Sequence, residues 1–149
     1  MPTKPRSELY QLIWQTRRLF QRLRACSDEM LEGKGINSSQ RAILEFLHSS
    51  DPKTVSQVAR EKSVSRQHVQ TLTNSLIDLK LVKCVENPGH KRSPLLKLTR
   101  KGSQLFQSIR QEEAAFIQKM EKQFSANDIT KTVQTMIAFD DYLASGDWK

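Results

Sequence analysis

Hydrophobic side chains recur at spacings of three and four residues near both ends of the chain, a pattern typical of helices with one apolar face. The first such stretch covers residues 7–32 and ends at two glycines, Gly33 and Gly35, which favour a helix stop. Two more long helices are predicted over residues 100–123 and 126–144. A small central module does not need such flanking helices, so we expect their apolar stripes to be buried in a homodimer.

The middle of the chain contains shorter helical segments. One opens after Asn37 or Ser38, either of which is a competent N-cap. A short helix follows Thr54, and another is predicted over residues 65–79 after a break at residues 62–63.

After these helices the hydrophobic period falls to two. Residues 81–86 and 95–99 alternate as strands do, and residues 87–94 between them contain two prolines and one glycine. Proline and glycine do not continue a helix here, so the segment is predicted to be a β-hairpin with a long basic tip. The fold class is therefore mainly α, an α+β winged helix-turn-helix.

Positive charge is concentrated in the same central segment. The protein has a net charge of +8, and residues 53–101 contain eleven lysines and arginines against three acidic residues. The charges of the two flanking parts, +2 and −2, cancel each other. A solvated basic face is the plain alternative, but confinement to one segment favours a surface that binds a polyanion.

The first two helices of this basic segment have the spacing of a helix-turn-helix. Ala59 is small enough for two helices to cross closely, and Val64 is expected to fill the turn. Val69 and Leu72 are expected to face inward from the second helix. Ser63 stands where glycine commonly makes the sharp turn, so either it adopts that conformation at some cost or the turn is wider.

The outward face of the second helix is predicted to read DNA bases. Arg, Gln and Asn make bidentate contacts to guanine or adenine in the major groove, and a serine N-cap brings a helix N-terminus toward phosphates. An ordinary polar surface, the alternative, would carry Lys and Glu more often. The predicted DNA-binding residues of this helix are Ser65, Arg66, Gln67, Gln70, Thr71 and Asn74.

A hairpin directly after a recognition helix is a wing. Its tip carries His90, Lys91 and Arg92, which we expect to insert beside the minor groove, where negative potential attracts arginine. A solvated loop is the alternative.

Nearly the whole chain resembles the MarR (multiple antibiotic resistance regulator) family of bacterial transcription factors. Members usually carry an aspartate two residues before the wing arginine, and here His90 stands in that place before Arg92. The residues that carry the resemblance are Val58 and Ala59, the helix opening Ser65-Arg66-Gln67, residues 76–82 and residues 92–102.

The resemblance implies one MarR-type domain over residues 1–149. Residues 7–32 and 102–146 would be dimerisation helices, and residues 36–101 the winged helix-turn-helix module that binds double-stranded DNA. The resemblance further implies a ligand-responsive regulator, usually a repressor, that binds a pseudo-palindromic operator. It suggests an effector pocket near Trp14, although an aromatic residue on an amphipathic helix more often belongs to a core or a dimer interface.

No catalytic, cofactor or metal site is expected. His48, His68 and His90 share no metal-ligand spacing with a cysteine or an acid pair, and the five glycines form no phosphate-binding loop. No nucleophile, base and orienting group cluster in the sequence, so an enzyme is not expected. The longest apolar run has four residues, which predicts no membrane span, and the chain is expected to be cytoplasmic.

The two cysteines are too few and too far apart for a disulfide framework, and we expect reduced thiols. Cys84 is expected to pack within its strand. Cys26 is expected to be a small buried apolar residue, and a peroxide-sensing thiol near Arg22 and Arg24 is the alternative.

Two further functions stay open beside sequence-specific regulation. One is non-specific binding of nucleic acid, including RNA, and the other is a winged helix that contacts an acidic protein. Modules that stack on single strands need exposed aromatic residues, and none occurs between Phe46 and Phe106. Double-stranded DNA is therefore the preferred partner.

Overall fold

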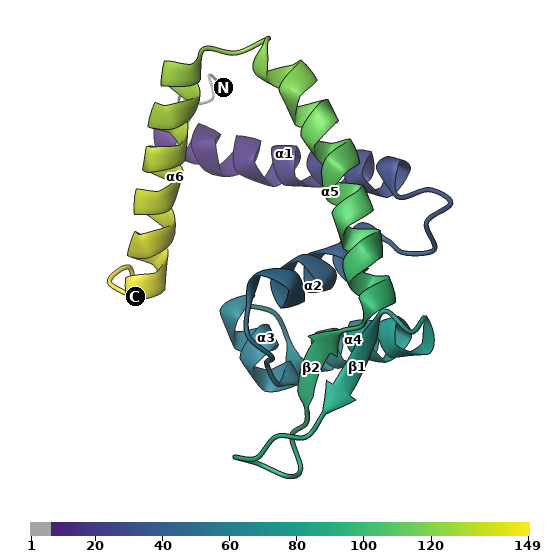
Figure 1. Ribbon diagram of the computed structural model, residues 1–149. Helices are drawn as coiled ribbons and strands as arrows, with labels where there is room; N and C mark the ends of the chain where they lie inside the picture. Colours follow the sequence, from purple (N-terminus) through teal and green to yellow (C-terminus); the bar gives the residue numbers. More distant parts are fainter. Residues whose placement is uncertain (1–6) are drawn as a thin grey trace, which may run out of the picture. The chain divides into compact units, whose positions relative to one another are not determined.

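The computed structural model describes residues 7–149, which form six helices and one two-stranded antiparallel sheet (Figure 1). The helical periods and the change to period two predicted every one of these elements, with bounds that differ by one or two residues. In chain order the elements are α1 (Glu8–Met30), α2 (Ser38–Ser49), α3 (Val55–Glu61), α4 (Arg66–Asp78), β1 (Val82–Val85), β2 (Leu95–Leu98), α5 (Arg100–Glu121) and α6 (Ala126–Ser145).

The chain divides into two compact units. The first extends to residue 107 and the second covers residues 108–149. The helix-turn-helix, the hairpin and the start of α5 all lie in the first unit, and α6 lies in the second.

The core of the first unit lies among α2, α3, α4, the hairpin and the start of α5 (Figure 1). Phe106 anchors α5 in this core, because its ring lies 5.1 Å from the ring of His48 and 5.6 Å from the guanidinium of Arg41. The largest fully buried side chains are those of Phe106, Ile43, Leu44, Leu76, Leu96, Val58, Val69, Val82 and Thr73.

Side-chain caps fix where the short helices begin. Asn37 caps α2, and its side chain and that of Gln40 accept each other's backbone amides at 2.9 Å. Thr54 and Gln57 form the same reciprocal capping box at the start of α3. Of the two caps expected for the first of these helices, Asn37 is therefore the one used.

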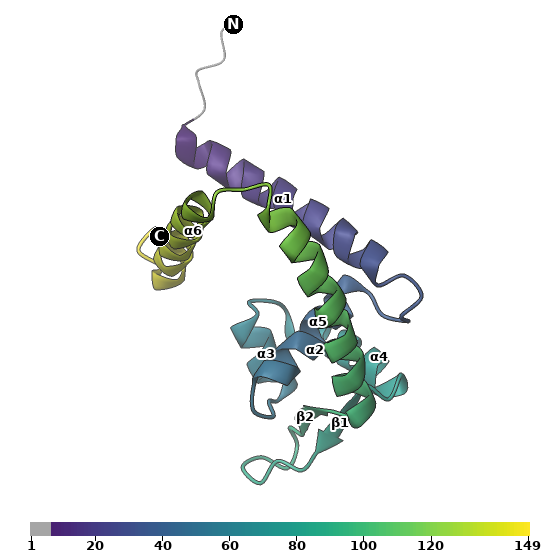
Figure 2. The same ribbon diagram turned by 45° about the horizontal axis from the view of Figure 1, so that its top comes forward.

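The hairpin pairs Val82 with Leu98 at its base and Val85 with Leu95 toward its tip. On the other edge of β2, the amide of Leu96 donates to the carbonyl of Lys53 at 2.8 Å, so β1 is the outer strand. In both views the loop between the strands extends away from α2, α3 and α4 (Figures 1 and 2).

Three packing expectations within residues 53–101 are wrong. Val64 does not fill the turn. Its side chain is 40% exposed at the surface, and its backbone amide donates to the carbonyl of Ala59 at the end of α3. Leu72 is only half-buried, since Val69, Thr73 and Leu76 share the inner face at spacings of four and three. Cys84 is exposed, since it lies on the outer strand toward the hairpin tip, whereas Val82 at the base of the same strand is buried.

Helices α1 and α6 bury no side chain within the described chain. Cys26 of α1 is exposed, which contradicts the expectation of a buried residue.

Among residues 7–149, no helix combines the length and the apolar composition that a membrane span requires. The exposed apolar side chains of α1 and α6 include Leu9, Trp14, Leu19, Phe20 and Leu23 of α1, and Ile129, Val133, Met136, Ile137 and Leu143 of α6.

Candidate nucleic-acid interface

A tight turn joins α3 to α4 and sets the crossing of the two helices. The amide of Ser63 donates to the carbonyl of Arg60 at 3.2 Å, and the amide of Val64 donates to that of Ala59 at 3.0 Å. This pair of bonds is the Schellman motif, which places Ser63 in the left-handed region with φ +52°. The serine therefore adopts the conformation that glycine commonly supplies, and the turn is not the wider one that the sequence also allowed.

Helix α4 is positioned by its inner face and by its N-cap. Val69 and Leu76 are fully buried against the core. The Ser65 hydroxyl accepts the amide of His68 at 3.1 Å, so the helix begins at Arg66 as predicted. This anchoring leaves the opposite face of α4 open to solvent.

All six predicted residues of this helix are exposed: Ser65, Arg66, Gln67, Gln70, Thr71 and Asn74. Two hydrogen bonds order them. Gln70 Nε2 donates to Asn74 Oδ1 at 2.8 Å, and the Thr71 hydroxyl donates to the carbonyl of Gln67 at 3.0 Å. Residues 66–77 contain no acidic side chain, so nothing on this face repels phosphates.

The three predicted wing residues, His90, Lys91 and Arg92, are exposed at the tip of the hairpin. Asn87 orders that tip. Its Nδ2 donates to the carbonyl of Ser93 at 2.8 Å, and its Oδ1 accepts the amide of Gly89 at 3.1 Å. The loop is thus closed on itself by one carboxamide, and the positive side chains are held at its end.

Sequence reasoning missed three residues that shape this unit. One is Asn87, whose side chain donates to the carbonyl of Ser93, six residues later; no repeating pattern in the sequence indicates this bond. Gln40 is another: beyond its cap to α2, its Nε2 donates to the Ser75 hydroxyl at 2.6 Å and ties α2 to α4. Thr73 is the third, because its hydroxyl is fully buried with no hydrogen-bond partner among the described residues.

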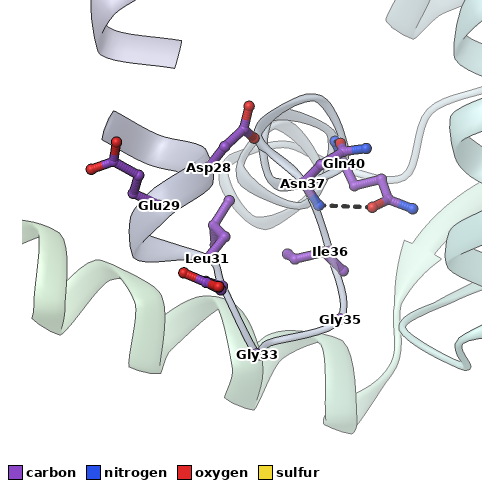
Figure 3. A pocket seen from close by; sticks show the side chains of 9 residues that line it. Asp28, Glu29, Leu31, Gly33, Gly35, Ile36, Asn37 and Gln40 are labelled. Carbon is purple, nitrogen blue, oxygen red and sulfur yellow. Dashed lines mark hydrogen bonds between the residues drawn. The ribbon is translucent and has the colours of Figure 1, made fainter. Parts of the chain in front are cut away.

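A hollow of about 600 Å³ lies between the end of α1 and the start of α2 (Figure 3). Leu31 and Ile36 contribute apolar lining, and Asp28 and Glu29 contribute carboxylates. The backbone amide of Ser38 donates to Asp28 at 2.7 Å, and hydrogen bonding to Ser38 lowers the pKa of Asp28 below its ordinary value. Trp14, where an effector pocket was expected, does not line this hollow.

The described residues contain no group of three His, Cys, Asp or Glu side chains placed to hold a metal ion. The charged groups of the interface are instead arginines and lysines on α4 and the wing. This arrangement can bind an anionic surface that also forms hydrogen bonds.

Comparisons with known proteins agree on the type of fold. The sequence model of the MarR family matches residues 34–93. The chain is 36% identical over 83 residues to the uncharacterized protein Rv2011c of Mycobacterium tuberculosis, covering 56% of this chain and 58% of that protein. A relative from Mycobacterium bovis gives the same values. The chain thus matches little more than half the length of these curated relatives.

Solved structures extend the likeness over nearly the whole chain. The crystal structure of a MarR family transcription regulator has a TM-score of 0.83 and 27% identity, covering 93% of this chain and 91% of that chain. Staphylococcus aureus MarR in complex with salicylate and kanamycin has a TM-score of 0.81 at 18% identity, over 92% and 93% of the two chains. Streptococcus pneumoniae FabT in complex with DNA has a TM-score of 0.76 at 19% identity, over 93% and 99%. The last two likenesses support the fold alone.

Proposed function

Because the sequence model of the MarR family matches residues 34–93 and a MarR family transcription regulator resembles the chain at 27% identity, we propose that the chain is a MarR-type, sequence-specific regulator that binds double-stranded DNA and represses transcription. The observation that carries this proposal is the exposed face of α4. It offers arginine, glutamine and asparagine side chains and no carboxylate, and the same unit carries the basic wing. A neighbouring structure of the same fold, FabT, is a complex with DNA.

The proposal assigns different work to the helix and the wing. Gln67, Gln70 and Asn74 are neutral and can pair with base edges, which discriminates between sequences. Lys91 and Arg92 are charged, and contacts to phosphate contribute to every sequence alike. Ser65, Arg66, Thr71 and His90 complete the proposed contact surface.

We further propose that the protein acts as a homodimer on a pseudo-palindromic operator. The exposed apolar stripes of α1 and α6 support a second copy of the chain as their partner. Two recognition helices related by a two-fold axis would read half-sites about ten base pairs apart, or a multiple of that spacing. We expect neither catalysis nor a bound metal.

A small-molecule effector is part of the proposal. The hollow between α1 and α2 supports it, because its apolar lining and ionised Asp28 would suit a cationic, partly apolar compound. The S. aureus structure of the same fold contains salicylate and kanamycin.

The test is affinity against salt concentration on selected and scrambled duplexes. Sequences are first selected from a random duplex library with the full chain. Gln67→Ala should relax specificity and leave the salt dependence nearly unchanged. Arg92→Ala should weaken binding to both duplexes and lower the log–log salt slope by about 0.9 for each lost phosphate contact.

Three results would contradict parts of this assignment. If Arg92→Ala loses only operator binding with an unchanged slope, the wing reads bases. If no sequence is enriched but binding persists, the protein is a non-specific nucleic-acid binder. If no duplex binds at low salt, the basic segment contacts another kind of partner.

A further inference from the structure

Gln70 and Asn74 are joined by a hydrogen bond that spans one turn of α4 on its exposed face. Gln70 Nε2 donates to Asn74 Oδ1 at 2.8 Å. Residues four apart on a helix lie on the same face, so the two carboxamides are neighbours there. Both side chains are exposed, and the bond therefore orders a surface rather than the core.

As long as Asn74 presents its Oδ1, this bond selects one orientation of the Gln70 carboxamide. An unattached carboxamide can turn by half a rotation and exchange its acceptor oxygen with its donor nitrogen. With Nε2 held by Asn74, the oxygen and the remaining N–H of Gln70 keep fixed positions on the outward face. Asn74 in turn keeps its own Nδ2 donors free for a neighbouring acceptor.

A carboxamide in one fixed orientation is selective among base pairs. Adenine presents an N6 donor beside the N7 acceptor in the major groove, and this order matches an acceptor beside a donor. Guanine presents two acceptors, N7 and O6, so the oxygen of a fixed carboxamide would face another acceptor. An unattached glutamine avoids that clash by pointing both of its N–H donors at N7 and O6, which is not possible while one N–H is bound to Asn74.

We propose that Asn74 is a positioning residue that holds Gln70 as the reader of one A·T base pair in each half-site. This inference rests on the proposed function, because it requires sequence-specific binding to duplex DNA. Gln67 provides the contrast within the same helix. Among the described residues, its side chain has no bond of this kind, although its backbone carbonyl accepts from Thr71.

The experiment compares base preferences position by position. Full-length wild type, Asn74→Leu, Asn74→Asp and Gln67→Ala are each used to select sequences from a random duplex library. Far-UV circular dichroism and urea unfolding check that each variant is folded. Leucine matches asparagine in size but cannot accept a hydrogen bond, whereas the aspartate carboxylate can accept the Nε2 proton of Gln70.

We expect wild type to prefer A·T at one position of each half-site. Asn74→Leu should lower that preference about tenfold, within the range of one lost bidentate contact, while the position that Gln67 contacts keeps its preference. Asn74→Asp should retain the preference at that position while binding every duplex more weakly, because its charge faces phosphates. Gln67→Ala should change a different position.

The outcomes separate this inference from the proposed function. If wild type enriches a motif and Asn74→Leu retains every preference, Asn74 positions nothing and the inference is overturned, while sequence-specific regulation stands. If folded Asn74→Leu loses all duplexes equally, Asn74 is a general affinity contact, which also overturns the inference. If wild type enriches no sequence, the proposed function itself fails.

Discussion

Two residues at the ends of short helices adopt a backbone conformation that favours glycine. Ser63 follows α3 with φ +52°, and Lys80 follows α4 with φ +60°. In each case the amide of the next residue returns to a carbonyl in the last turn of the helix, as in a Schellman motif. In this region a residue with a Cβ is strained, which lowers the free energy of unfolding by about 1–2 kcal/mol. Glycine at either position would relieve that strain.

Ser63→Gly should raise the free energy of unfolding by about 0.5–1 kcal/mol. The substitution removes the left-handed cost of about 1–2 kcal/mol, and glycine adds about 0.5–1 kcal/mol of backbone entropy. Urea unfolding followed by circular dichroism measures the difference. Ser63→Ala keeps the Cβ and is the matched control, for which we expect no gain. Equal stabilisation by both variants would show that the backbone conformation is not the cause.

Asp28 should make the stability of the first unit depend on acid pH. Hydrogen bonding to Ser38 lowers the pKa of Asp28 from its ordinary value of 3.8. A carboxylate whose pKa falls on folding stabilises the protein above its ordinary pKa, and that contribution is lost as pH falls through the folded value. Asp28→Asn should therefore be less stable than wild type at pH 7, and the difference should shrink below about pH 4.

Urea unfolding of both proteins between pH 7 and pH 3 measures this difference. Glu29→Gln removes a neighbouring charge that makes no bond to Ser38 and serves as the control. A stability difference for Asp28→Asn that stays constant down to pH 3 would contradict the role of the ionised carboxylate.

At the scale of the elements, the backbone at the start of α5 packs closely against the backbone of Leu81, just before β1. A Cβ added to Gly102 would lie 2.0 Å from the carbonyl oxygen of Leu81, so only glycine fits. The hydroxyl of Thr99 donates to the carbonyl of Lys80 at 2.7 Å and accepts the amide of Gly102 at 3.0 Å. The end of α4, the base of the hairpin and the start of α5 thus meet at one junction.

Gly102→Ala should lower the free energy of unfolding by about 1–3 kcal/mol, because the added methyl group forces backbone atoms apart. Gly89→Ala is the matched control, since its added Cβ would meet only the Asn87 side chain at 3.5 Å. Urea unfolding of the three proteins measures the effect. Equal stability of the two variants would contradict a close contact at Gly102.

The elements were predictable because their signals are local. Period, glycine stops and cap residues such as Asn37, Thr54 and Ser65 lie within a few positions of the bounds they set. The exposure of Cys84 was not predictable in this way. Alternation identifies a strand, but which edge is covered depends on Lys53, far away in the sequence.

In the candidate interface, too, the sequence predicts some features and not others. The exposure of the reading face follows from the helical period once Val69 and Leu76 are placed inside. The order of the wing tip does not, because it depends on the turn that lets the carboxamide of Asn87 reach Ser93. Composition and period carry no information on that turn.

For the whole molecule, the open question is what covers the apolar faces of α1 and α6. Neither helix buries a side chain within the described chain, and Ile137 of α6 is 56% exposed. A second copy of the chain is the occupant that the proposed function requires. Burial of these stripes in an interface would supply the stability that the isolated helices lack.

Ile137→Glu should weaken self-association by about 2 kcal/mol or more, because it places a charge in an apolar interface. Sedimentation equilibrium of the full chain measures the dissociation constant. Thr135→Glu adds the same charge on the opposite, polar side of α6 and is the control. A wild-type chain that sediments as a monomer would overturn the proposed homodimer, and equal effects of both variants would place the dimer contact elsewhere.

The uncovered stripes of α1 and α6 also affect how such a regulator responds to its own abundance. If the apolar stripes of these helices are buried only in a dimer, folding is coupled to dimerisation. The thermal stability of the protein then rises with its concentration. An operator read by two recognition helices is occupied by pairs. At low abundance its occupancy therefore follows the square of the chain concentration, and halving the supply of the protein frees the operator more steeply than binding of a single chain would allow.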